Sequence, residues 1–134
     1  MRQTIFAAML LVAALAVAAP AQQSNASAVA GDAAPHMGRA PEKPNGIGRL
    51  DARVFDEQGN PVPNAYVKLD SNRTDGFFCE AWNSTNSTGV AVLPPIHMGA
   101  LKLTVKAKGY ETQKLDVPTT SLGEPVRITL LKKK

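Results

Sequence analysis

The sequence predicts an all-β fold, a seven-stranded antiparallel Greek-key sandwich of the transthyretin-like or Ig-like kind. Three observations support this prediction. Apolar and polar residues alternate from residue 47 almost to the end of the chain. The apolar runs are short, regularly spaced and separated by Gly, Pro, Asn and Asp, as in two-sheet sandwiches. No window has the 3.6-residue periodicity of a helix of normal length.

Residues 1–21 have the features of a secretory signal peptide. Arg2 precedes an apolar run over residues 5–19, and Ala19, Pro20 and Ala21 form a small-x-small cleavage site. The alternative is an uncleaved anchor, but a spanning helix needs about 20 apolar residues, and Pro20 interrupts the run before that length. We therefore expect a secreted or periplasmic protein. The cleavage point carries no cysteine, so a lipoprotein is not expected.

Residues 22–45 are rich in Ala, Gly, Pro, Ser and Asn and show no apolar periodicity. Such a composition predicts a flexible linker. The domain itself is expected over residues 46–132.

The first strands of the domain are expected on either side of a turn. Leu50, Ala52 and Val54 should face one way, and Arg49, Asp51 and Arg53 should face the other. Residues 54–69 then form a hairpin-like unit, because Gly59, Asn60 and Pro61 are turn formers and residues 65–69 alternate again.

The remaining strands follow from the same alternation. The clearest lies at residues 101–107, where four apolar residues alternate with lysines and threonine. Shorter strands are expected at residues 90–93, 115–117 and 126–130. Ile128 is predicted to point inward.

Residues 77–82 are expected to form a third strand, although either of its faces could be the inner one. The strand and the polar loop after it supply the candidate ligand-binding residues, Phe77, Trp82 and Asn83, since aromatic rings beside an amide can present a platform to a sugar or peptide. Core packing of Trp82 is the alternative, and the one we favour.

Other residue types give no site with a defined chemistry. Cys79 is the only cysteine, which excludes an internal disulfide, and we expect it to be buried. His97 has no Ser, Asp or Cys at a spacing typical of a catalytic triad. The formal charge of +4 comes from Arg2 and residues 132–134, a predicted solvated chain end. We therefore predict no catalytic residues, no metal, no cofactor and no nucleic-acid partner.

Three segments in order resemble the carboxypeptidase regulatory-like domain. They are RVFDEQGNPVPNAYVKL, TNSTGVAVLPPIHMGALKLTVKAKGYE and PVRITLLKK. The resemblance covers about residues 46–132, and it matches at Gly89, at residues 93–95 and at residues 109–110. It implies a transthyretin-like sandwich, which carboxypeptidases use as a non-catalytic accessory module and which occurs in many secreted bacterial proteins. The insertion at residues 96–98 and the strand at 79–82 depart from the family pattern.

Enzymes with similar sandwiches fit the sequence poorly. Intradiol dioxygenases hold iron with two tyrosines and two histidines, and this chain has that number, but His36 lies in the predicted linker and no His-x-His is present. Hydroxyisourate hydrolases need a first-strand histidine that is absent here. We expect a non-catalytic module for binding or structural spacing, with an unknown protein or glycan partner. The alternatives are a carbohydrate or small-ligand binding domain and an unrecognised hydrolase around His97.

Overall fold

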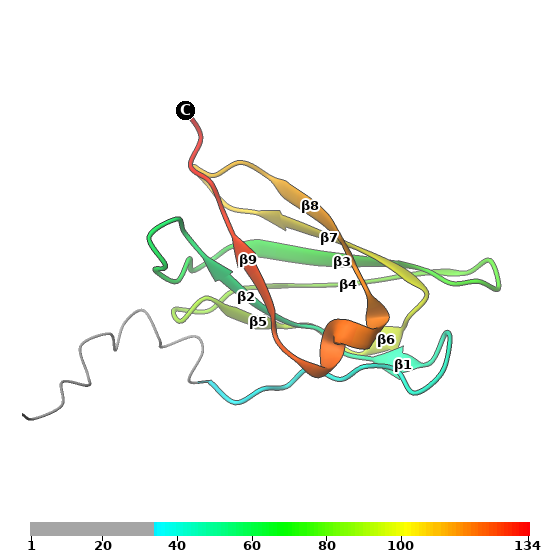
Figure 1. The fold of residues 1–134 in the computed structure, drawn as a ribbon. Coiled ribbons are helices and arrows are strands. Elements are labelled where there is room, and N and C mark those ends of the chain that lie inside the picture. The colour runs from blue at the N-terminus through cyan, green and yellow to red at the C-terminus, as the bar shows by residue number, and fades with distance from the viewer. Residues whose placement is uncertain (1–33) are drawn as a thin grey trace, which may run out of the picture.

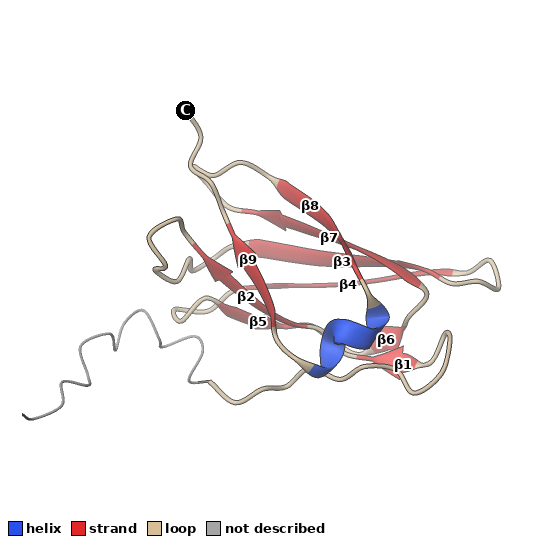
Figure 2. Cartoon of the chain, in the orientation of Figure 1, coloured by secondary structure: helices blue, strands red, loops and turns tan. Residues whose placement is uncertain are grey.

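The computed structural model describes residues 34–134, which form an all-β fold (Figures 1 and 2). The predicted signal peptide and residues 22–33 lie outside the described residues. No helix in the described part is long and apolar enough to cross a membrane. In chain order the elements are β1 (Ile47–Gly48), β2 (Asp51–Phe55), β3 (Tyr66–Asn72), β4 (Phe78–Ser84), β5 (Val90–Val92), β6 (Ile96–His97), β7 (Ala100–Lys106), β8 (Gln113–Val117), the 3-10 turn η1 (Thr119–Gly123) and β9 (Val126–Thr129).

Two sheets make up the sandwich. One has the order β4-β3-β7-β8 and the other β5-β2-β9, and β1 and β6 form a separate two-stranded pair. The chain crosses from one sheet to the other after β2, β4, β5 and β8, so each sheet is built from distant segments. Figure 1 shows β3 and β7 at the centre of the larger sheet, with β4 at one edge and β8 at the other.

The core lies between the sheets and is built from the predicted alternating positions. Ala52 and Val54 of β2, Ile128 of β9, and the inward residues of β3 and β7 are all buried. Burial of these aliphatic side chains is the main stabilising contribution in a domain without a disulfide among its described residues. The inward assignment of Ile128 is thus confirmed.

The fold class is confirmed, but the strand arrangement differs from the prediction in two details. The described residues hold nine strands rather than seven, because the two-residue strands β1 and β6 are too short to give an alternating pattern. The sandwich is also not wholly antiparallel, since β2 pairs with β9 in parallel, with Val54 opposite Ile128.

The hairpin-like unit over residues 54–69 is not a hairpin. β2 lies in the smaller sheet and β3 in the larger one, so the turn joins two layers rather than two paired strands. Within the turn, Asp56 Oδ1 accepts hydrogen bonds from the main-chain N–H groups of Gln58 and Asn60, each at 2.9 Å. The turn residues were identified correctly, but alternation alone does not tell which strand pairs with which.

Residues 34–45 lie against the sandwich and differ in this from the predicted flexible linker. Arg39 and Arg49 exchange main-chain hydrogen bonds at 2.9 Å, and the main-chain N–H of Met37 donates to Asp51 Oδ2 at 3.0 Å. This 34–45 segment covers the outer side of β2. As a result Asp51 and Arg53, on the charged side of this strand, are only 1% and 2% exposed.

Candidate binding surface

β4 has a small inner face and a large aromatic outer face. Ala81 is buried, whereas Phe78, Glu80 and Trp82 alternate with it and are exposed or half-buried. Because successive residues of a strand point to opposite sides, the inward position of Ala81 fixes the three others on the outer surface of the sheet. The sequence left the choice between these faces open, and the structure settles it.

Trp82 is 55% exposed, and Phe77 is 66% exposed. Our preference for Trp82 in the core was therefore wrong. The physical reason is the position of β4 at the edge of the larger sheet, where the inner side leaves room for the methyl group of Ala81 but the outer side is open. Large exposed aromatic residues gathered on one strand mark a candidate interaction site.

Charged residues of β3 flank this aromatic strand. Trp82 is paired with Lys68 and Glu80 with Asp70 in the β3–β4 register. Lys68 Nζ lies 3.4 Å from Glu80 Oε2 and 3.4 Å from Asp70 Oδ1, so one ammonium group bridges two carboxylates. The pKa of Lys68 is raised, mainly because Lys68 donates a hydrogen bond to Glu80 and secondly because of the negative charge of Asp70. A fixed cation and two fixed carboxylates thus stand beside the Trp82 ring.

The turn from β3 to β4 presents Phe77. The Arg73 guanidinium lies 5.4 Å from the centre of the Phe77 ring and also pairs with Asp75, whose Oδ1 accepts from the main-chain N–H of Phe77 at 3.3 Å. Partial desolvation opposes the charged form of Asp75, but the hydrogen bonds from Phe77 and Arg73 outweigh it, and the pKa of Asp75 is lowered. These contacts hold the Phe77 main chain in place although its ring is exposed.

Asn83 has a structural role in addition to its position beside Trp82. Its Nδ2 donates to the carbonyl of Val92 at 3.0 Å, which ties the edge strand β4 to β5 of the other sheet. Its Oδ1 accepts from the main-chain N–H of Ser84 at 2.9 Å.

The structure does not place the three predicted site residues on one face. Trp82 shares the outer face of β4 with Phe78 and Glu80. Asn83, the next residue along the strand, points to the opposite side, and Phe77 lies in the turn just before β4. The alternation at residues 78–82 already placed Phe78 and Glu80 on one side with Trp82. Sequence reasoning missed Lys68, whose position beside Trp82 follows only from the pairing of β3 with β4.

Cys79 points toward the inner side of β4, opposite Ser71, and is half-buried. The expectation of a fully buried thiol is met only in part. Because β4 is the edge strand of the larger sheet, neighbouring residues cover the Cys79 side chain less than they cover residues on the central strands.

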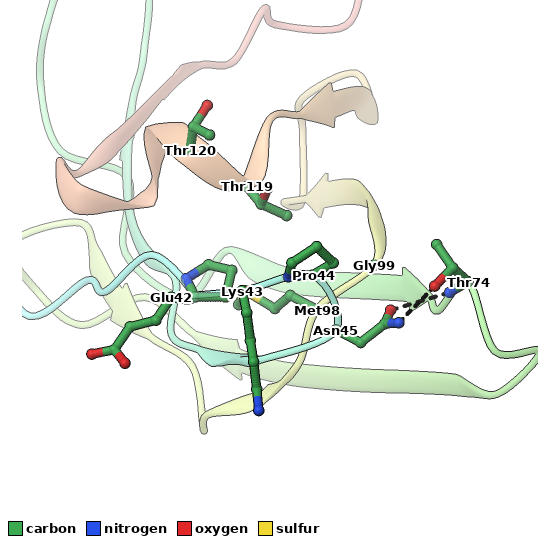
Figure 3. Close-up of a pocket in the computed structure, with 10 residues that line it drawn as sticks. Glu42, Lys43, Pro44, Asn45, Thr74, Met98, Gly99, Thr119 and Thr120 are labelled. Carbon is green, nitrogen blue, oxygen red and sulfur yellow. Dashed lines mark hydrogen bonds between the residues drawn. The ribbon is translucent and has the colours of Figure 1, made fainter.

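A second candidate region lies at the end of the sandwich near η1, where two open pockets of about 380 and 460 Å³ flank residues 41–46. Figure 3 shows Pro44 and Met98 below Thr119 of η1, with the side chain of Asn45 directed toward Thr74. Asn45 Nδ2 donates to Thr74 Oγ1 at 2.6 Å, and its main-chain N–H donates to the carbonyl of Met98 at 3.1 Å. Asn45 adopts a left-handed φ of 62°, which asparagine tolerates better than most residues.

His97 lines the larger of these pockets together with Arg39, Glu42 and Lys43. Its Nδ1 lies 2.9 Å from the carbonyl oxygen of Asn45. Since a carbonyl oxygen only accepts, Nδ1 carries the proton in this contact. The residues that line this pocket include no serine, threonine, cysteine or aspartate. Within residues 34–134 no group of three or more His, Cys, Asp or Glu is placed to hold a metal ion.

The model of the carboxypeptidase regulatory-like domain matches residues 49–131. This match covers more than half of the chain. The chain belongs to this family. Its fold is the sandwich that the resemblance implies. Residues 34–45, which precede the matched range, pack against this sandwich. No curated protein matches the sequence.

Solved structures with a similar fold include two dioxygenases. A catechol 1,2-dioxygenase from Acinetobacter sp. ADP1 has 14% identity and a TM-score of 0.51, and the match covers 72% of this chain and 56% of that one. A 3-chlorocatechol 1,2-dioxygenase from Rhodococcus opacus 1CP has 12% identity and a TM-score of 0.53, covering 72% and 64%. This chain therefore spans less than two thirds of each enzyme, and the likeness is one of fold.

The two tyrosines and two histidines that were compared above with the iron ligands of such enzymes do not lie together in this chain. His97 precedes β7 and Tyr110 follows it, so the seven residues of the strand, about 20 Å, separate them. Tyr66 pairs with Lys106 at the Tyr110 end of β7. His36 instead lies near Asp51, at 3.9 Å from Oδ2.

Proposed function

We propose that this chain is an exported, non-catalytic β-sandwich module that binds a ligand through the outer face of β4. The proposed surface consists of Phe78, Glu80 and Trp82 with Lys68 of β3. The apolar run over residues 5–19 supports export, because it has the length and flanks of a signal peptide.

The observation that carries the proposal is the exposure of Trp82 on a rigid strand. A tryptophan in solvent forgoes the burial that its large apolar surface offers, and its retention there is best explained by a partner that covers it. The strand is held by β3 on one side and by the Asn83–Val92 hydrogen bond, so the ring is presented on a preformed surface.

Carbohydrate is the ligand class that this surface favours. A sugar needs an aromatic face for its apolar C–H groups and charged or polar groups in fixed positions for its hydroxyls. Trp82 supplies the aromatic face. Lys68, directly opposite Trp82 in the β3–β4 register, supplies a charged group together with the two carboxylates that it bridges, Glu80 and Asp70.

The non-catalytic character is supported by the family and by the histidine. Residues 49–131 match the carboxypeptidase regulatory-like domain, and the resemblance to this family implies an accessory module rather than a reaction centre. His97 directs its Nδ1 proton to a main-chain carbonyl, and its pocket is lined by no hydroxyl or thiol nucleophile. A hydrolase around His97 is therefore the weaker candidate.

The test is binding to a panel of soluble polysaccharides, measured by affinity electrophoresis, with Trp82→Ala as the variant. Loss of the stacked ring should weaken binding at least tenfold, while Trp82→Phe should retain part of it. Ile47→Ala is the matched control, because Ile47 is equally exposed, at 55%, but lies on β1.

Two outcomes would overturn the proposal. The first is that no polysaccharide of the panel slows the unmodified protein. The second is that Trp82→Ala and Ile47→Ala weaken binding equally, which would show that the β4 face is not the site. Circular dichroism of each variant shows whether the fold is retained.

A further inference from the structure

Six lysines from three segments gather at one corner of the sandwich. Lys106 ends β7, Lys108 lies in the turn to β8, and Lys114 lies on β8, where it pairs with Thr104 two residues before Lys106. The other three are residues 132–134. We call these six residues the lysine cluster.

Main-chain hydrogen bonds bring residues 131–133 to this corner. The N–H of Lys133 donates to the carbonyl of Gly109 at 3.0 Å, and the N–H of Glu111 donates to the carbonyl of Leu131 at 2.7 Å. Lys132 and Tyr110 form an isolated bridge between these two bonds. The end of the chain therefore runs beside the β7–β8 turn (Figure 1), and its charges are added to those of the turn.

The lysine cluster is exposed and makes no ion pair among the described residues. Each of the six side chains is exposed, and the salt bridges of this part of the chain involve other cations. Lys68 and Lys102 show the contrast, because both lie on the same sheet and each faces a carboxylate within 4 Å. The cluster thus has charge available for a partner.

The corner has a strong net charge. Glu111 lies in the turn, and Glu57 Oε1 accepts from the main-chain N–H of Lys132 at 3.4 Å. Asp116 of β8 is paired with Lys102, outside the cluster. None of these carboxylates forms a side-chain ion pair with a lysine of the cluster among the described residues. The charge at residues 132–134 is therefore added to that of the β7–β8 turn, while the side chains stay exposed as predicted for a solvated chain end.

We propose that the lysine cluster attaches this module to the surface of an anionic lipid bilayer. Leu131, which is 41% exposed and directly precedes Lys132, favours a bilayer over a soluble polyanion, since an exposed apolar side chain next to lysines can enter the headgroup region. Clusters of this size have a substantial affinity for anionic lipids. This proposal goes beyond ligand binding by β4 and is independent of it, because the two surfaces share no residue.

The test is cosedimentation of residues 22–134 with vesicles of phosphatidylcholine containing 30 mol% phosphatidylglycerol. This range is the predicted mature chain and holds every strand. Binding is expected in low salt, with a steep decrease as the salt concentration rises. Vesicles of phosphatidylcholine alone should not retain the protein. The triple variant Lys108→Gln, Lys132→Gln, Lys133→Gln should lower the partition coefficient by roughly 100-fold, since each lysine contributes a factor of about five.

The control is a triple variant with the same net charge but with changes elsewhere, Arg39→Gln, Lys43→Gln and Lys102→Gln. It should bind nearly as the unmodified chain does. Equal losses in the two triple variants would show that binding follows net charge alone and would overturn the proposal. A failure of the unmodified chain to bind anionic vesicles would also overturn the proposal. Binding to soluble polyphosphate as tight as to vesicles, and unaffected by Leu131→Ser, would identify a soluble polyanion as the ligand and would also overturn it.

Discussion

Arg53 and Asp51, two residues apart on β2, form a buried ion pair with two hydrogen bonds. Arg53 Nε lies 3.0 Å from Asp51 Oδ1, and Nη2 lies 3.0 Å from Oδ2. The same Nη2 donates to the carbonyl oxygens of Ala34 and Pro35, at 3.0 and 3.1 Å. The pair thus fastens the 34–45 segment to the outer side of the smaller sheet.

Removal of one partner of this pair should be strongly destabilising. Arg53→Met leaves the Asp51 carboxylate buried without its counter-ion, which should cost about 3–5 kcal/mol of unfolding free energy. The measurement is urea denaturation at neutral pH. The double variant Asp51→Val, Arg53→Met should recover most of the loss, because an apolar pair carries no desolvation cost. A single variant as stable as the parent would contradict the account.

Truncation distinguishes a folded segment from a linker. Compared with a chain that begins at residue 34, one that begins at residue 46 loses the hydrogen bonds that Arg53 donates to the carbonyls of Ala34 and Pro35 and the one that Met37 donates to Asp51. Because such bonds contribute more than neutral ones, we expect a loss of roughly 3–5 kcal/mol. Equal thermal midpoints for the two chains would show that residues 34–45 are the flexible linker that their composition predicts.

Ile128 tests the packing of β9 on the core. A change to aspartate places an unpaired charge at a position that is 4% exposed, and it should cost about 3 kcal/mol or more. Thr129→Asp is the matched control, since residue 129 is exposed on the same strand and should change stability little. Denaturation midpoints of the two variants give the comparison, and similar midpoints would refute the inward position of Ile128.

Asp75 should contribute to stability in the acidic range. Its pKa is lower in the folded protein than the usual 3.8, so the folded state binds fewer protons there than the unfolded state. The contribution is present above pH 3.8 and is lost as the pH falls through the folded pKa. Arg73→Gln should raise the pKa of Asp75, which carboxyl chemical shifts measure by NMR. An unchanged titration would show that Arg73 does not stabilise the charged carboxylate.

The sequence predicted the core well because alternation depends on burial alone. Ala52, Val54, Leu103 and Ile128 lie inside, as their positions in the pattern require. Strand pairing could not be predicted in the same way. β2 pairs with β9, which lies at the other end of the chain, and the local sequence pattern of neither strand indicates that contact.

The wrong preference at Trp82 and the unexpected burial of Asp51 and Arg53 have one cause. The alternation groups the side chains of each strand by side, but it does not show what covers either side. The outer side of β2 is covered by a segment whose composition resembles a linker, and the outer side of β4 is left open. The lysine cluster was missed for the same reason, since it depends on a tertiary contact between residues 109–111 and 131–133.

The most direct test of the central claim is the fluorescence of Trp82, the only tryptophan of the chain. For an exposed ring we expect red-shifted emission that acrylamide quenches readily, and a polysaccharide that binds β4 should shift the emission to the blue and protect the ring. Blue-shifted emission that resists acrylamide in the free protein, and that no polysaccharide alters, would contradict an exposed binding face on β4.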